Sequence, residues 1–219
     1  MESMISEPVF KEYMDALLHG KREKCRRVVT ELIHKKADIK DVYTNLFQKS
    51  MYEIGSLWEH NKISIAKEQI ATAITENLLS LFYPTLFSAE RTGHTSVICS
   101  VHEENHQIGG KMVADFFESR GWNSEYVEIR DPVDDFLGYL KVKDPDMVGF
   151  SVSLQQNIPY MKQLIRKVKS IFPGVSLIIG GQAFATGTAA VLKEFSGIIY
   201  IADLFDLEKF LMEWTPEKS

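Results

Sequence analysis

The chain contains few cysteines and no long apolar run. Two cysteines, Cys25 and Cys99, occur in 219 residues, so a disulfide framework is not indicated and the sequence fits a reducing compartment. The N-terminus lacks the basic-then-apolar order of a secretory signal peptide. The longest apolar stretch, residues 78–87, is too short to span a bilayer and contains Pro84. We therefore expect a cytoplasmic protein without membrane association.

A stripe of basic residues is also absent. The formal net charge is −5, and acidic and basic residues are mixed along the chain. The one local exception, KREKCRR at residues 21–27, lies in a helical pattern and is typical of a solvated helix face. Because binding to phosphates needs clustered Lys and Arg, the composition argues against direct nucleic-acid binding.

Three common binding motifs are missing as well. The sequence has no G-x-G-x-x-G turn and no P-loop, so the usual dinucleotide and nucleotide triphosphate sites are not expected. It also has no cluster of His, Cys and carboxylate residues with the spacing of a zinc site.

The first ninety residues have the pattern of a helical domain. Apolar residues recur at helical spacing in four stretches, 9–20, 25–36, 42–60 and 63–82. Gly20 ends the first stretch, and residues 35–40 separate the second from the third. Four helices joined by short connections predict an antiparallel four-helix bundle spanning residues 1–90.

After a polar linker at residues 88–96, the pattern changes to alternating strands and helices. Short β-branched runs occur at residues 95–101, 124–129, 146–153, 175–181 and 197–202. Helical patterns follow them at residues 108–121, 132–143, 158–172, 189–195 and 204–214. This alternation predicts an α/β domain over residues 95–219, with a doubly wound five-stranded parallel sheet of the flavodoxin-like or Rossmann-like type.

Unusual residues follow three of the predicted strands, where ligands bind in doubly wound sheets. The three stretches are EENHQIGG (103–110), SVSLQQN (151–157) and GGQAF (180–184). In the first, His106 is a candidate metal ligand, and Glu104 could accept a hydrogen bond from its far ring nitrogen. A lone protein ligand suits a metal that a macrocycle already holds.

These stretches resemble the cobalamin-binding domain family. ENHQIG (104–109) is similar to its D/E-x-H-x-x-G signature, SVS (151–153) to its S-x-L or S-x-T motif, and the glycines at 180–181 to its later glycines. The helical half resembles the cap that covers the corrin in this family. The resemblance extends over nearly the whole chain.

The resemblance implies roles for individual residues. His106 would displace the cofactor's own benzimidazole and bind cobalt, and Ser151 would hydrogen-bond the displaced base. Gly109, Gly180 and Gly181 would leave room for the nucleotide tail. The same motifs assign cofactor contacts to Gln107, Ile108, Ser153, Leu154 and Gln182.

Within the family, the cap resembles that of cobalamin-dependent light sensors. Trp58 and Glu68 match the residues that line the sensors' upper pocket, whereas Gln69 replaces a His. Trp58 could instead fill the bundle core, as large aromatics usually do. The signature begins with Glu104, whereas methyl-carrying corrinoid proteins usually have Asp.

The leading hypothesis is therefore a cobalamin-binding sensor that responds to light through adenosylcobalamin. Methylcobalamin and hydroxocobalamin are alternative forms of the cofactor. The signal would pass to a regulator or signalling protein, or through a change of homo-oligomer. Two other functions stay open: a corrinoid methyl-carrier subunit of a methyltransferase system, and a haem-binding sensor of the same fold. In none of the three is the chain itself expected to be a catalyst.

Overall fold

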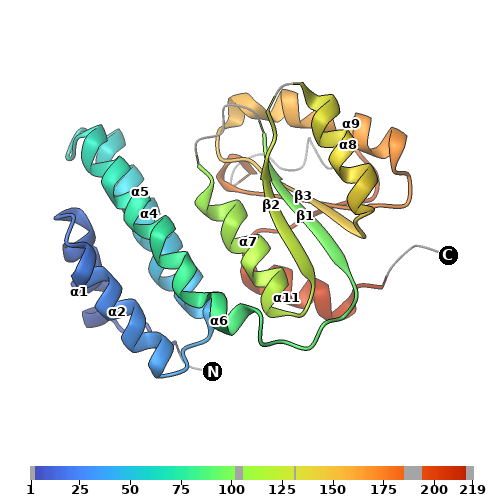
Figure 1. Ribbon diagram of the computed structural model, residues 1–219. Helices are drawn as coiled ribbons and strands as arrows, with labels where there is room; N and C mark the ends of the chain where they lie inside the picture. Colours follow the sequence, from blue (N-terminus) through green and yellow to red (C-terminus); the bar gives the residue numbers. More distant parts are fainter. Residues whose placement is uncertain (1–2, 102–105, 131, 185–193, 216–219) are drawn as a thin grey trace. The chain divides into compact units, whose positions relative to one another are not determined.

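The computed structural model describes residues 3–101, 106–130, 132–184 and 194–215, and Figure 1 shows the chain as a ribbon. The contacts divide the chain into two compact units, Met1–Thr85 and Leu86–Ser219. We call them the helical unit and the α/β unit and describe each by itself. Among the described helices, none is both long and apolar enough to cross a bilayer.

The helical unit contains the four predicted helices. They are α1 (Glu7–Leu18), α2 (Arg22–His34), a long helix made of α3 (Ile39–Asp41), a π-helical stretch (Val42–Gln48) and α4 (Lys49–Glu59), and α5 (Ile65–Leu79). A short 3₁₀ turn (Ser80–Phe82) and α6 (Tyr83–Leu86) follow.

The third helix differs from the prediction at its start. It begins at Ile39 instead of residue 42, because the side chain of Asp38 caps it by accepting a hydrogen bond from the backbone N of Lys40 (2.8 Å). Its π-helical first half had no signal in the sequence. The end of α1 is as predicted, since Gly20 adopts a positive φ of 64° that closes the turn to α2.

Aromatic side chains form the centre of the helical unit. Tyr43 and Phe82 pack edge to face with ring centroids 5.3 Å apart, and Phe47 lies 6.0 Å from Tyr13. All four are almost completely buried. They join α1, the π-helical stretch and the 3₁₀ turn after α5, and such aromatic pairs add to the burial of apolar area.

The α/β unit contains five parallel strands in the order β2-β1-β3-β4-β5. The strands are β1 (Thr95–Ser100), β2 (Asn123–Glu128), β3 (Met147–Ser151), β4 (Ser176–Gly180) and β5 (Ile198–Tyr200). The predicted doubly wound sheet is therefore confirmed. Strand β1 starts at Thr95, so the last two residues of the predicted linker belong to the sheet.

Helices cover both faces of the sheet. They are α7 (Ile108–Ser119), α8 (Val133–Lys143), α9 (Ile158–Ile171) and α11 (Leu204–Glu213). Figure 1 shows α7 and α11 on one face and α8 and α9 on the other, and an ion pair between Arg120 and Glu208 joins the first two. The helix predicted at 189–195 falls mostly outside the described residues.

Both cysteines are free and buried, one in each unit. Burial raises the pKa of the Cys25 thiol to about 11 and raises that of Cys99 well above its ordinary value. Neither thiol is therefore suited to act as a thiolate at neutral pH, in accord with the prediction that the fold does not depend on disulfides.

A buried carboxylate fixes the segment that leads into β1. Glu118, near the end of α7, accepts hydrogen bonds from Nη1 of Arg91 (2.6 Å) and from the backbone N of Ser124 (2.7 Å). Arg91 also donates to the carbonyl of Trp122 (2.7 Å). The same segment also packs closely against Gly121. A Cβ there would lie 2.0 Å from the carbonyl oxygen of Glu90, so this close approach requires glycine.

This network predicts a stability effect for Glu118→Gln. The amide keeps the shape but loses the charge, so it cannot satisfy both Arg91 and the Ser124 N–H, and we expect a loss of about 2 kcal/mol. A urea titration followed by tryptophan fluorescence measures it.

Glu23→Gln on the surface of α2 is the matched control. Its nearest Arg26 nitrogen is 3.9 Å away and both side chains are exposed, so we expect a change below about 0.5 kcal/mol. Equal losses in the two variants would contradict the assignment of Glu118 as a buried anchor.

Candidate functional site

The strand order places a switch point between β1 and β3. The chain passes from β1 to β2 on one side and then crosses to β3 on the other, so the carboxyl ends of β1 and β3 border the crevice where ligands bind in such sheets. The segment containing His106 follows β1, and β3 ends at Ser151. Two of the three predicted site stretches thus border the switch point.

The strand register aligns residues from three strands in a row. Ser100 of β1 pairs with Ser151 of β3, which pairs with Gly180 of β4. Neighbouring strands lie about 4.8 Å apart, so the predicted residues Ser151 and Gly180 are direct neighbours. We call Ser100, Ser151 and Gly180 the small-residue row.

The small-residue row faces α7. Side chains alternate between the two faces of a strand, and Cys99, Phe150 and Ile179 belong to the apolar core that α8 and α9 cover. The row points the other way, which the helix confirms: a Cβ on Gly110 would lie 3.4 Å from Cβ of Ser151. The face under α7 is therefore built from small polar residues at its carboxyl end.

The two glycines in the first turn of α7 are present for different reasons. A Cβ on Gly110 would lie 2.6 Å from Cε2 of Tyr126, so the protein's own packing excludes a side chain there. A Cβ on Gly109 would meet only Oγ of Ser151 among the described residues, at an ordinary distance of 3.8 Å. Gly109 is exposed. Internal packing does not explain this glycine, whereas close approach of a ligand would.

The glycine pair after β4 has an internal explanation. Gly181 has φ 107°, and a Cβ there would lie 2.3 Å from the carbonyl oxygen of Val152. A Cβ on Gly180 would lie 2.8 Å from the carbonyl oxygen of Ile201. Both contacts involve backbone, so this turn needs glycine in any case, and a role of the pair in making room for a ligand stays a prediction.

His106 lies two residues before α7 and is exposed. Gln107 is half-buried, and Ile108 anchors the start of the helix with 8% of its surface exposed. Glu104 lies outside the described residues, so its predicted hydrogen bond to His106 stays a prediction. No group of three or more His, Cys, Asp or Glu in the described ranges is arranged to hold a metal ion.

The other predicted residues of the α/β unit follow β3 and β4. Ser153 and Leu154 are half-buried, and Gln182 is exposed at the start of a short 3₁₀ turn (Gln182–Phe184). They lie beyond the carboxyl ends of these strands, as predicted.

In the helical unit, the predicted residues lie near the junction of α4 and α5. Trp58 is 41% exposed in the last turn of α4, so it does not fill the bundle core. Oε1 of Glu68 accepts a hydrogen bond from the Thr72 hydroxyl (2.9 Å), and Gln69 is exposed. Trp58 thus keeps a large apolar surface available for a ligand or partner.

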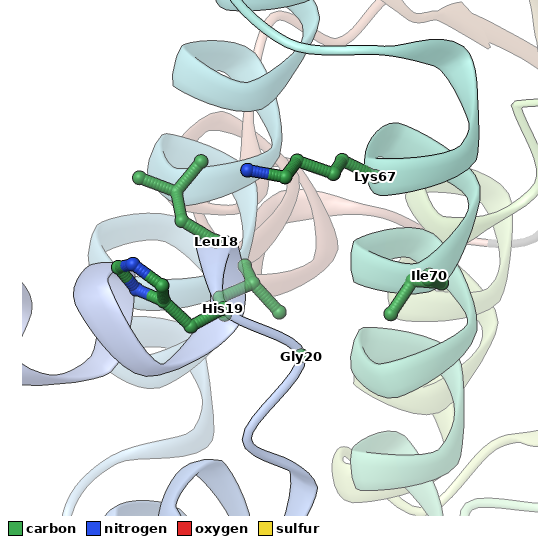
Figure 2. Close-up of a pocket in the computed structure, with 6 residues that line it drawn as sticks. Leu18, His19, Gly20, Lys67 and Ile70 are labelled. Carbon is green, nitrogen blue, oxygen red and sulfur yellow. The ribbon is translucent and has the colours of Figure 1, made fainter.

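A pocket in this unit does not coincide with those residues. Its volume is about 240 Å³, and it is lined by Leu17, Leu18, His19, Gly20, Lys67 and Ile70. Figure 2 shows Lys67 and Ile70 of α5 opposite the end of α1. Ligand pockets are commonly about 300 Å³ or larger, so this one is too small for a macrocycle.

Two further residues belong to this region and were not predicted from the sequence. Ser100 completes the small-residue row, and Tyr126 packs against Gly110. A polar residue ending the apolar run TSVICS was the only signal for Ser100. Tyr126 had none, because its proximity to α7 depends on strand order.

Comparison with known proteins identifies the family. A B12 binding domain model matches residues 95–203, and a second B12 binding domain model matches residues 9–82. Dimethylamine corrinoid protein 3 of Methanosarcina acetivorans is 24% identical over 178 residues, which cover 80% of this chain and 83% of that protein. Dimethylamine corrinoid protein 1 of the same organism is 24% identical over 184 residues, covering 81% and 85%.

The fold has a solved counterpart. The structure of Methanosarcina barkeri monomethylamine corrinoid protein matches with a TM-score of 0.76 at 15% identity, covering 94% of this chain and 98% of that chain. At this identity the likeness concerns the fold. The family models match both units, and the motifs after β1, β3 and β4 fall within the larger match. The chain belongs to the family of B12-binding proteins.

Proposed function

We propose that the protein is a corrinoid methyl carrier that works with a separate methyltransferase. The two Methanosarcina acetivorans relatives are named as dimethylamine corrinoid proteins, which favours a carrier over a light sensor. The sensor hypothesis rests on Glu104, Trp58 and Glu68, and no relative named above is described as responding to light. The family is one of B12-binding proteins, so we do not propose haem binding.

The names of the relatives carry the carrier role, and the structural observation that supports corrinoid binding is the open space at Gly109. Beside an exposed His106, the first turn of α7 lacks a side chain where internal packing would allow one. Directly below is the hydroxyl of Ser151. An imidazole, a bare helix turn and a hydroxyl suit a base-off corrinoid, whose cobalt takes a protein ligand and whose nucleotide tail passes close to backbone.

Each residue would have a distinct task in this carrier. His106 would hold cobalt from below, Ser151 would hydrogen-bond the displaced base, and Gly109 would let the tail pass. When bound, the corrin would supply a cobalt atom that accepts a methyl group from one partner and yields it to another. The protein's share is binding and orientation. This role makes methylcobalamin the expected working form in place of adenosylcobalamin.

The first prediction concerns the cobalt ligand. We expect His106→Ala to remove the axial nitrogen, so that the absorption spectrum of protein-bound hydroxocobalamin changes and the dissociation constant rises at least about tenfold. His19→Ala, an exposed histidine of the helical unit, is the control and should change neither. If His106→Ala binds with unchanged affinity and an unchanged spectrum, another residue holds the cobalt.

The second prediction separates ligand approach from internal packing. Gly109→Ala should leave the apoprotein as stable as the wild type or more stable by about 0.5 kcal/mol, because alanine is the better helix former. Its affinity for cobalamin should fall at least about tenfold.

Gly110→Ala is the matched control for the second prediction. The added methyl group would clash with Tyr126, so the apoprotein should lose about 1–3 kcal/mol. Thermal unfolding and cobalamin titration measure both quantities. A Gly109→Ala protein that binds cobalamin normally would show that this space is not on the cofactor's path.

The third prediction tests the carrier role itself. The protein is loaded with reduced corrinoid and mixed with dimethylamine and a methylamine methyltransferase from the organism that makes this protein. We expect the absorption spectrum of the methylated cofactor to appear. Omitting the methyltransferase should abolish the change. The sensor hypothesis predicts the opposite: no methylation with any methylamine, but a change in assembly when the adenosylcobalamin-loaded protein is illuminated, as measured by size-exclusion chromatography.

A further inference from the structure

Two hydrogen-bonded hydroxyl pairs join β1 to β2 on the face that α7 and α11 cover. Ser96 and Ser124 form one of them at the amino edge of the sheet, with 2.8 Å between their oxygens. Ser100 and Tyr126 form the other at the carboxyl edge, with 2.7 Å between their oxygens. The register pairs Tyr126 with Ile98, so its ring leans toward the carboxyl edge to reach Ser100. Both Ser96 and Ser100 are fully buried, so the two bonds are comparably shielded from water.

The pair at the carboxyl edge supports the start of α7. A Cβ on Gly110 would lie 2.6 Å from Cε2 and 3.1 Å from Cδ2 of Tyr126, so the backbone of the first turn rests directly on the ring. The same Cβ position is 3.4 Å from Cβ of Ser151. Gly110 therefore fills the gap between Tyr126 and Ser151. The ring faces the helix and not a ligand, and its contribution is to hold the helix in place.

The predicted cobalt ligand is attached to this first turn. Gln107 is the N-cap residue of α7, and its carbonyl accepts a hydrogen bond from the backbone N of Lys111 (3.0 Å). Ile108, the next residue, is buried. His106 directly precedes Gln107 and is exposed, so the placement of its backbone follows that of the turn. Functional sites need their ligating side chains held to within about 0.5 Å, and a turn that shifts on the Tyr126 ring would move His106 with it.

We propose that Ser100 and Tyr126 are positioning residues, whose hydrogen bond fixes the first turn of α7 and thereby the placement of His106 at cobalt. The inference rests on the proposed function, because it requires His106 to bind the metal. Without the bond, the ring is free to tilt and the turn above it to shift, while the pairing of β1 with β2 persists. Groups that orient a metal ligand in this way add to affinity without touching the metal.

Removing either hydroxyl tests the proposal. Ser100→Ala and Tyr126→Phe delete opposite partners of the same bond, and phenylalanine keeps a ring under Gly110. Either variant serves if the other does not fold. Ser96→Ala is the matched control, because it deletes the equivalent bond between the same two strands at the amino edge. We expect all three variants to lower the thermal unfolding temperature of the apoprotein by similar amounts, about 2–6 °C.

Binding of methylcobalamin should distinguish the variants that are alike in stability. Ser100→Ala and Tyr126→Phe should each raise its dissociation constant about fivefold and shift the absorption spectrum of the bound cofactor toward that seen with His106→Ala. Ser96→Ala should stay within about twofold of the wild type in affinity and give the wild-type spectrum. If both Ser100→Ala and Tyr126→Phe keep the wild-type affinity and spectrum, the hydroxyl pair only stabilises the fold and the inference is wrong.

A double-mutant cycle separates positioning of His106 from general support of the site. In His106→Ala no imidazole remains to be placed, so adding Ser100→Ala should change the dissociation constant by less than about twofold. A further fivefold loss in the double variant would show that Ser100 acts on binding through another part of the fold, which overturns the inference. If the wild type binds no cobalamin, or His106→Ala binds it with wild-type affinity and spectrum, the proposed function or its cobalt ligand is wrong, and the inference fails with it.

Discussion

The register of β1, β3 and β4 is the constraint on which the site depends. It places Ser100, Ser151 and Gly180 side by side at one edge of the sheet, and because strand side chains alternate, a slip of one residue would turn all three toward α8 and α9. The apolar residues between them, such as Phe150 and Ile179, are locked in the opposite core. The packing of that core therefore keeps the small-residue row on the face under α7.

The glycines after β1 and β4 are present for two different reasons, which the sequence does not distinguish. Gly110, Gly180 and Gly181 are required by contacts with Tyr126 or with backbone carbonyls, whereas Gly109 meets no close obstacle in the described residues. A motif that contains all of them is therefore a folding signal at three positions, and at Gly109 internal packing does not explain it. The two kinds of glycine differ only in the folded protein, because the distance to the next strand or helix decides whether a methyl group would fit.

The sequence was sufficient to predict the architecture and the position of the candidate site at the ends of the strands. Alternating β-branched runs and helical patterns predicted the five parallel strands, and the strand ends predicted where His106 and Ser151 would lie. It was insufficient for Ser100 and Tyr126, because their roles come from strand order and register, which link residues distant in the chain. The π-helical stretch was missed because aromatic packing, not local propensity, holds Tyr43 and Phe47. Trp58 could be placed on a helix but not assigned to core or surface by periodicity alone.

The two faces of the sheet are packed differently, and the proposed corrinoid site lies on the less apolar one. Large side chains such as Phe150, Met161 and Leu164 fill the face under α8 and α9 and supply buried apolar area. At its carboxyl edge, the face under α7 has the small residues Ser100, Ser151 and Gly180 and therefore buries less apolar area. A protein that must admit a large, rigid cofactor without unfolding needs this asymmetry, since a face packed for maximum stability leaves no room to bind. Substitutions that enlarge the small-residue row should therefore be judged by binding as well as by stability, because they would fill space at the proposed corrinoid site.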